Sequence, residues 1–112
     1  MQYYDEEQAG ALRAALEKKI LEWPQVDTRR MFGCPAYVAD ARLFAFLVTE
    51  GVVITQLRLR DRQALAQDYQ TEPFQAGERV IERWVKVSVP GPDKLPRLMR
   101  FIKRSYETAL DH

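Results

Sequence analysis

The stretch that decides the fold is Arg29–Pro35, which reads RRMFGCP and leads directly into the strand-like segments Tyr37–Asp40 and Leu43–Leu47. In it a bulky apolar pair is followed by a glycine and a proline, residue types that reverse a chain. We expect Met31 and Phe32 to anchor the end of one strand, Gly33 to let the backbone turn, and Pro35 to begin the next strand. The stretch carries no catalytic pattern, so it informs the fold and not the chemistry.

Length and composition predict one folded domain spanning residues 1–112. Of the 112 residues, 46% are hydrophobic and 29% are charged, which is typical of a soluble globular protein and unlike a disordered chain. Seventeen Lys and Arg residues nearly balance sixteen Asp and Glu residues, giving a formal net charge of +1. Such a chain has no strong overall field to attract nucleic acid or an anionic membrane, so any charged partner must meet a local patch.

The sequence also favours a cytoplasmic protein with no membrane association. Its first residues are acidic where a secretory signal is basic, and no apolar segment follows them. The longest apolar stretch, Leu43–Leu57, is interrupted by polar residues and is too short to cross a bilayer. The single cysteine, Cys34, excludes an internal disulfide and agrees with a reducing compartment.

Hydrophobic periodicity predicts the first half of the fold. Apolar residues recur at helical spacing over Asp5–Trp23, where Asp5 and Gln8 are spaced as a capping box and Pro24 ends the helix. Between Val26 and Leu57 the period changes to two, which indicates four short strands joined as antiparallel hairpins. The last two of these strands are apolar almost throughout, so we expect them to be central, with helices against one face.

The second half is predicted to contain two helices and one strand. Asp61 is placed to cap a short helix that ends before Glu72–Phe74. Trp84–Val89 alternates as a fifth strand, and an apolar stripe from Asp93 onward indicates a long carboxy-terminal helix. The predicted fold class is therefore α+β, a single domain with a five-stranded antiparallel sheet, an N-terminal helix, a short middle helix and a long C-terminal helix.

This order of elements, together with Arg30–Gly33 and the Trp84–Val87 strand, resembles the N-terminal domain of TfoX-type competence regulators in the YjbR-like superfamily. The resemblance covers essentially the whole chain. It implies an α+β fold of the secretion-chaperone-like type and a non-enzymatic, regulatory role that is poorly defined within the family. The chain departs from the family at the Asp40–Arg42 turn, which lacks the usual glycine.

Few residues suggest catalysis or cofactor binding. Cys34 lies beside two arginines that would favour a thiolate, but the alternative is a small packed residue, and the only histidine, His112, ends the chain. One cysteine and one histidine do not make a metal site, and the isolated glycines form no phosphate-binding loop. A low-weight alternative is a small pocket around Cys34 and Tyr37. We expect no enzymatic activity, no cofactor and no metal.

Two groups of arginines are the candidate site for phosphate or nucleic acid. Both belong to predicted helices or their starts, and the sequence does not tell whether they meet in space. The alternative interpretation is a solvated helix face, which we favour because no aromatic residues interleave the arginines to stack on bases. The candidate residues are Arg58, Arg60, Arg62, Arg97, Arg100 and Arg104.

Five aromatic residues are expected to lie in the core rather than to line a ligand pocket, with an alternative for the last of them: Phe32, Phe44, Phe46, Phe74 and Trp84. Trp84 is out of phase with the valines of its strand, so Trp84 and Lys86 are candidates for an exposed surface that binds a partner. The function predicted from the sequence is a non-catalytic protein-interaction or regulatory module with an unidentified protein partner, which includes a second copy of itself. The alternative function is nucleic-acid binding through the arginines.

Overall fold

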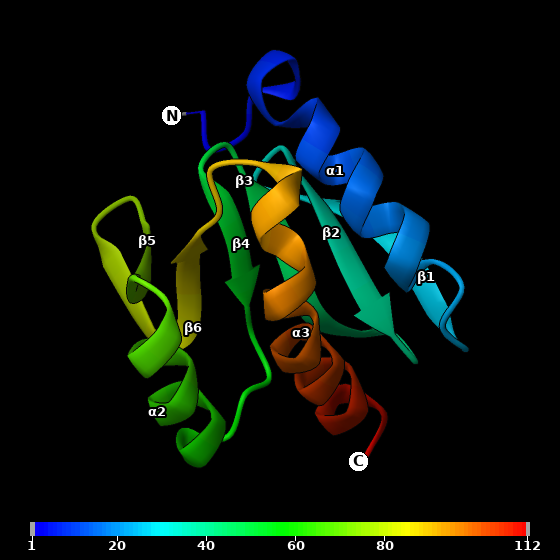
Figure 1. The fold of residues 1–112 in the computed structure, drawn as a ribbon, viewed down its shortest axis with the longest axis vertical. Coiled ribbons are helices and arrows are strands. Elements are labelled where there is room, and N and C mark those ends of the chain that lie inside the picture. The colour runs from blue at the N-terminus through cyan, green and yellow to red at the C-terminus, as the bar shows by residue number, and fades with distance from the viewer. Residues whose placement is uncertain (1, 112) are drawn as a thin grey trace.

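Six strands form one antiparallel sheet in the computed structural model, which describes residues 2–111 (Figure 1). The sheet order is β1-β2-β3-β4-β6-β5, so β3 and β4 are central, as the sequence predicts, and β1 and β5 are the edges. The strands are β1 (Val26–Met31), β2 (Cys34–Ala39), β3 (Arg42–Val48), β4 (Gly51–Ile54), β5 (Thr71–Ala76) and β6 (Arg79–Ser88).

Three α-helices accompany the sheet, which confirms the predicted α+β class. They are α1 (Glu6–Ile20), α2 (Leu59–Asp68) and α3 (Leu95–Leu110), and a short 3₁₀ turn (Pro92–Lys94) precedes α3. Helix α3 lies across the central strands with α1 beside it on the same face, and α2 packs against α3 (Figure 1). The apolar stripe of α3 is buried against the sheet, as its periodicity predicts.

The prediction of five strands is wrong, because the segment after α2 forms a strand of its own. We expected Glu72–Phe74 only to end the middle helix, but β5 runs through it and pairs with β6, which begins five residues before the predicted Trp84. Strand β5 is an edge strand, where Pro73 is tolerated because its missing amide faces away from the ladder. In β5 only Phe74 is buried, so the strand lacks the alternation that would reveal it.

The helix ends also differ from the prediction in detail. Asp5 caps α1, since its side chain accepts a hydrogen bond from the Glu7 amide (3.0 Å), but the Asp5 amide donates to Thr49 Oγ1 (2.9 Å) rather than to Gln8. Asp61 does not cap α2. Arg58 occupies that position with no side-chain cap, and Asp61 lies in the first turn, where its charge still favours the helix.

A bulge in β3 sends two neighbouring phenylalanines to opposite faces of the sheet. Tyr37 of β2 pairs with Ala45, whereas Val38 pairs with Leu43, so Phe44 is an extra residue in the ladder. The Phe44 ring packs against Trp23 and Tyr106 on the helix side. The Phe46 ring packs against Phe74 and Trp84 on the other side, and both phenylalanines are fully buried.

Buried hydroxyl groups satisfy the backbone at this bulge. Ser105 of α3 donates to the Phe44 carbonyl oxygen (2.7 Å) and accepts from the Gln56 amide (3.0 Å). Thr55 Oγ1 donates to the Leu43 carbonyl oxygen (2.9 Å). These contacts fix α3 over the bulge by directional bonds as well as by apolar packing.

Both tight hairpins at the β1 end of the sheet place non-glycine residues in the left-handed region. Phe32 (φ 55°) and Gly33 (φ 75°) join β1 to β2, and Asp40 (φ 51°) and Ala41 (φ 67°) join β2 to β3. Positive φ at both central residues matches the twist of the flanking strands, which explains why these two-residue turns form. Aspartate tolerates this region, whereas alanine is strained in it because of its Cβ atom.

Replacing Ala41 with glycine should therefore stabilise the protein. We expect Ala41→Gly to raise the free energy of unfolding by about 1 kcal/mol, because glycine adopts positive φ without a Cβ clash. Ala66→Gly on the exposed surface of α2 is the matched control and should lower it by about 1 kcal/mol. Urea unfolding measures the free energy of unfolding of both variants. An equal decrease in the two variants would contradict the strain at Ala41.

Candidate functional site

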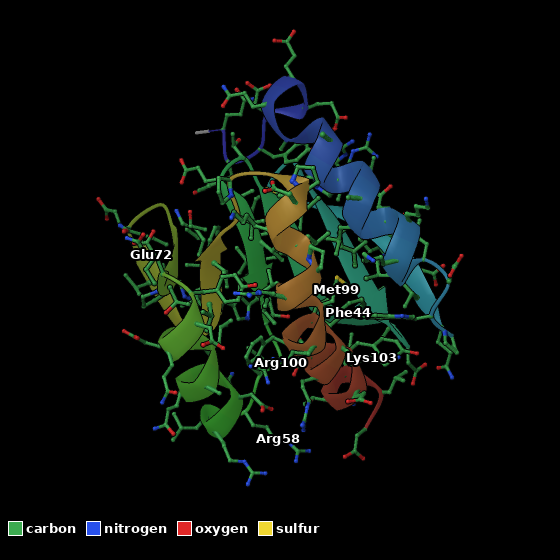
Figure 2. The ribbon with its side chains drawn as sticks, viewed as in Figure 1. Phe44, Arg58, Glu72, Met99, Arg100 and Lys103 are labelled. Carbon is green, nitrogen blue, oxygen red and sulfur yellow. The ribbon has the colours of Figure 1, made fainter. Side chains whose placement is uncertain are left out.

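The two arginine groups lie on neighbouring helices, but acidic residues already pair with some of them. Arg100 Nη2 lies 3.2 Å from Asp68 Oδ2 at the end of α2, and Arg58 Nη2 lies 3.6 Å from Asp111 Oδ2 beyond α3. Figure 2 shows Arg58 and Arg100 on the side where α2 and α3 approach each other. The structure therefore brings Arg58 and Arg100 to one side of the molecule and places a carboxylate beside each of them.

The remaining arginines differ in how they are presented. Arg60, Arg97 and Arg104 are exposed, whereas Arg62 is half-buried and its Nε atom is buried without a hydrogen-bond partner. Arg97 and Arg100 line an open cleft of about 1090 Å³ between α2 and the start of α3. Asp68 and Asp93 line the same cleft, so its charge is mixed rather than uniformly basic.

The candidate partner surface lies on the opposite face of the sheet. We call this side the helix-free face; it carries Phe46, Phe74, Trp84 and Lys86 and faces away from α1 and α3. Trp84 and Lys86 are partly buried, so the exposure that the sequence predicts is incomplete. The Trp84 ring packs edge-on against Phe46 with a centroid distance of 5.5 Å.

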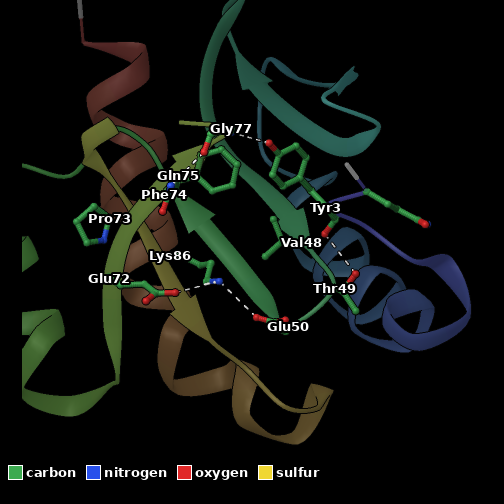
Figure 3. Close-up of a pocket in the computed structure, with 11 residues that line it drawn as sticks. Tyr3, Val48, Thr49, Glu50, Glu72, Pro73, Phe74, Gln75, Gly77 and Lys86 are labelled. Carbon is green, nitrogen blue, oxygen red and sulfur yellow. Dashed lines mark hydrogen bonds and ion pairs between the residues drawn. The ribbon is translucent and has the colours of Figure 1, made fainter. Parts of the chain in front are cut away.

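Lys86 sits between two carboxylates on this face (Figure 3). Its Nζ atom lies 3.0 Å from Glu72 Oε1 and 3.3 Å from Glu50 Oε2. Partial burial acts to lower the pKa of Lys86, but the hydrogen bonds to Glu72 and Glu50 outweigh it, so the net pKa is raised. A hollow of about 430 Å³ lies beside this triad, with Tyr3 and Phe74 also in its lining.

An aromatic cluster joins the two edges of the sheet across the helix-free face. Phe32, at the turn between β1 and β2, lies 6.0 Å from Phe74 of β5 and 5.9 Å from Tyr3, measured between ring centroids. The Tyr3 hydroxyl accepts a hydrogen bond from the Gly77 amide (2.9 Å) at the turn between β5 and β6. The sheet therefore curls until residues near its opposite edges meet.

Phe32 is the aromatic residue whose placement differs most from the prediction. Its side chain is 46% exposed, although the sequence suggests that it is part of the core, whereas Phe44, Phe46 and Phe74 are buried as expected. The reason is its position at the tip of a two-residue turn, where a side chain projects beyond the strands. The glycine after Phe32 was the available signal, since it marks such a turn.

The alternative pocket around Cys34 and Tyr37 is closed. Both side chains are fully buried, and the Tyr37 hydroxyl donates to Glu17 Oε2 (2.7 Å). Burial raises the pKa of the Cys34 thiol to about 11, and the nearby charge of Arg30 only partly opposes this. The thiol is therefore protonated at neutral pH. His112 lies outside the described residues.

Comparisons with known proteins add no assignment, since the chain matches no protein-family model, no curated protein and no solved structure. Within residues 2–111, no helix is long and apolar enough to cross a membrane. The same residues contain no group of three or more His, Cys, Asp or Glu side chains placed to hold a metal ion. The site must therefore be judged on its own geometry.

The buried thiol predicts a specific pH dependence of stability. In the unfolded chain the Cys34 thiol has an ordinary pKa of 9.0, whereas burial in the folded protein raises its pKa to about 11. Its contribution to the free energy of unfolding is therefore complete below pH 9 and is lost as pH rises toward 11. Urea unfolding of the wild type and of Cys34→Ala should show a stability difference that shrinks over this interval. A difference independent of pH would contradict the raised pKa.

Proposed function

We propose that this chain is a non-catalytic protein-interaction module of the TfoX N-terminal type, with a regulatory role, which binds a protein partner on its helix-free face. The observation that carries the proposal is the aromatic cluster on that face, in which Phe32 is exposed. A phenylalanine that is 46% exposed and a partly exposed tryptophan favour burial against another surface. The resemblance of residues 30–33 and of the Trp84–Val87 strand supports the family part of the proposal.

The composition of this face supports a protein rather than a small-molecule partner. The exposed ring of Phe32 and the partly exposed ring of Trp84, with the buried ring of Phe74 between them, form an apolar centre. The salt-bridged Lys86 and its two carboxylates form a charged border. An apolar centre with a polar rim is the usual make-up of protein interfaces, in which aromatic residues contribute most of the binding energy. The hollow beside Lys86 has Glu50, Glu72 and Lys86 in its lining, and these charged groups already pair with one another (Figure 3).

Substituting Phe32 tests the proposal directly. We expect Phe32→Ser to abolish retention of a specific partner in affinity capture, because it removes the exposed ring from the apolar centre of the face. Leu59→Ser is the matched control, since Leu59 is 61% exposed but lies on α2. The control should retain the partner at the wild-type level. Loss of retention in both variants, or in neither, would contradict the assignment of the face.

Circular dichroism and urea unfolding must accompany the capture experiment. Phe32 also touches Tyr3 and Phe74, so a variant that fails to fold would mimic a loss of binding. Lys86→Glu provides a second variant, which places three carboxylates together at the border of the same face. We expect it to weaken retention through charge repulsion, and unchanged retention in both face variants would overturn the proposal.

The mixed charge of the cleft favours this proposal over nucleic-acid binding, and the two are separated by one measurement. We expect no mobility shift with single- or double-stranded nucleic acid at low salt, because Asp68 and Asp111 lie beside Arg100 and Arg58 and reduce the local positive charge. A shift that weakens with added salt and is lost in the Arg97→Ala, Arg100→Ala, Arg104→Ala triple variant would instead establish the alternative function. Leu59→Ser serves again as the control that leaves the arginines unchanged.

A further inference from the structure

The outer edge of β1 is a candidate pairing surface. Four successive residues of this strand, Asp27, Thr28, Arg29 and Arg30, are exposed, and within residues 2–111 β1 pairs only with β2. The other edge strand, β5, carries Pro73 and an irregular register beside it, and both features discourage pairing with another chain. Strand β1 has neither feature, although it runs regularly over six residues.

The register with β2 shows which backbone groups of β1 face outward. Asp40 donates its amide hydrogen to the Gln25 carbonyl oxygen (3.1 Å), one step beyond the Val26 and Ala39 pair. Because hydrogen-bonded and non-hydrogen-bonded pairs alternate in an antiparallel ladder, the odd-numbered residues of β1 bond to β2. The amide and carbonyl groups of Thr28 and Arg30 and the carbonyl group of Val26 therefore point away from β2. The Val26 amide already donates to the Trp23 carbonyl oxygen (3.4 Å).

We propose that β1 pairs with β1 of a second copy of this chain, antiparallel, with Thr28 opposite Thr28 of the second copy, so that two sheets become one. A two-fold axis requires one residue of β1 to lie directly opposite its own copy. Since the even-numbered residues carry the outward hydrogen-bonding groups, they must also lie opposite even-numbered residues of the second copy. This restricts the register to a few choices, which the charges of β1 distinguish.

Charge complementarity selects the register centred on Thr28. In it Asp27 lies directly opposite Arg29 of the second copy, and by symmetry this pair forms twice. Centring on Asp27 or on Arg29 instead would place like charges face to face. Neither Asp27 nor Arg29 has an ion-pair partner within residues 2–111. Arg29 Nη1 instead donates to the Thr28 carbonyl oxygen (2.9 Å), which this pairing would release.

This dimer uses the strand edge and does not depend on the proposed function of the helix-free face. Phe32→Ser should leave dimerisation unchanged, because the Phe32 side chain lies in the turn beyond β1. Failure of one proposal is therefore distinguishable from failure of the other.

A charge-swap series with sedimentation velocity tests the pairing. We expect the wild type to dimerise, Asp27→Arg to weaken the dimer about tenfold through two like-charge pairs, and the Asp27→Arg, Arg29→Asp double variant to restore it. Thr28→Pro removes an outward-facing amide without breaking a bond to β2, and should also yield monomers. A wild type that stays monomeric at every concentration overturns the proposal. So does a dimer that these variants leave unchanged.

Cysteine cross-linking tests the register itself. Thr28→Cys places two thiols opposite each other at a Cα separation of about 5.5 Å, within the range for a disulfide. Arg30→Cys is the matched control on the same face of β1, because its two copies would be offset by four residues, about 14 Å. The native Cys34 is buried and does not compete. Under oxidation only Thr28→Cys should form covalent dimers, and equal cross-linking of the two variants would overturn the register.

Discussion

The bulge at Phe44 is the constraint on which the arrangement of this fold depends. Without the extra residue, Phe44 and Phe46 would point to the same face, and one face of the sheet would lose its central aromatic ring. The bulge is held by Ser105 and Thr55, whose hydroxyls bond to neighbouring carbonyl groups of β3. Removing the Ser105 hydroxyl would leave the Gln56 amide unpaired in the interior, at a cost of about 1–3 kcal/mol.

The bulge gives the sheet two different apolar faces. On one face Phe44 supports the contact of α3 with Trp23 and Tyr106, which closes the main core. On the other, Phe46 is covered by rings of Phe74 and Trp84 rather than by a helix. Because bulges increase twist and bend strands, the same irregularity agrees with the curl that brings Phe32 to Phe74. One extra residue thus accounts for both the packing of α3 and the shape of the helix-free face.

Local pattern in the sequence was sufficient for the elements that are regular and half-buried, such as α3 and the valines of β6. Local pattern was insufficient where contacts with other elements decide the structure. The run Leu43–Leu47 is apolar at every position, so no alternation marks the bulge, and a serine within the α3 stripe was the available sign. Strand β5 was missed because its exposed residues show no period. The placement of Arg58 and Arg100 on one side of the molecule depends on how α2 packs against α3, which no local pattern encodes.

The two edge strands, β5 and β1, differ in how much they contribute to the core and in how regular their outer edges are. Strand β5 contributes Phe74 to the aromatic cluster and also has Pro73, so it builds the helix-free face without offering a regular edge. Strand β1 contributes almost nothing to the core, since only its end residues Val26 and Met31 are partly buried. Because β1 buries so little apolar surface, its packing adds little to the stability of the fold. Its outer edge has no neighbouring strand within residues 2–111. Asp27 and Arg29 have no ion-pair partner within residues 2–111, whereas Arg100 of α3 already pairs with Asp68. This difference is why the proposed pairing uses the β1 edge rather than the arginines of α3.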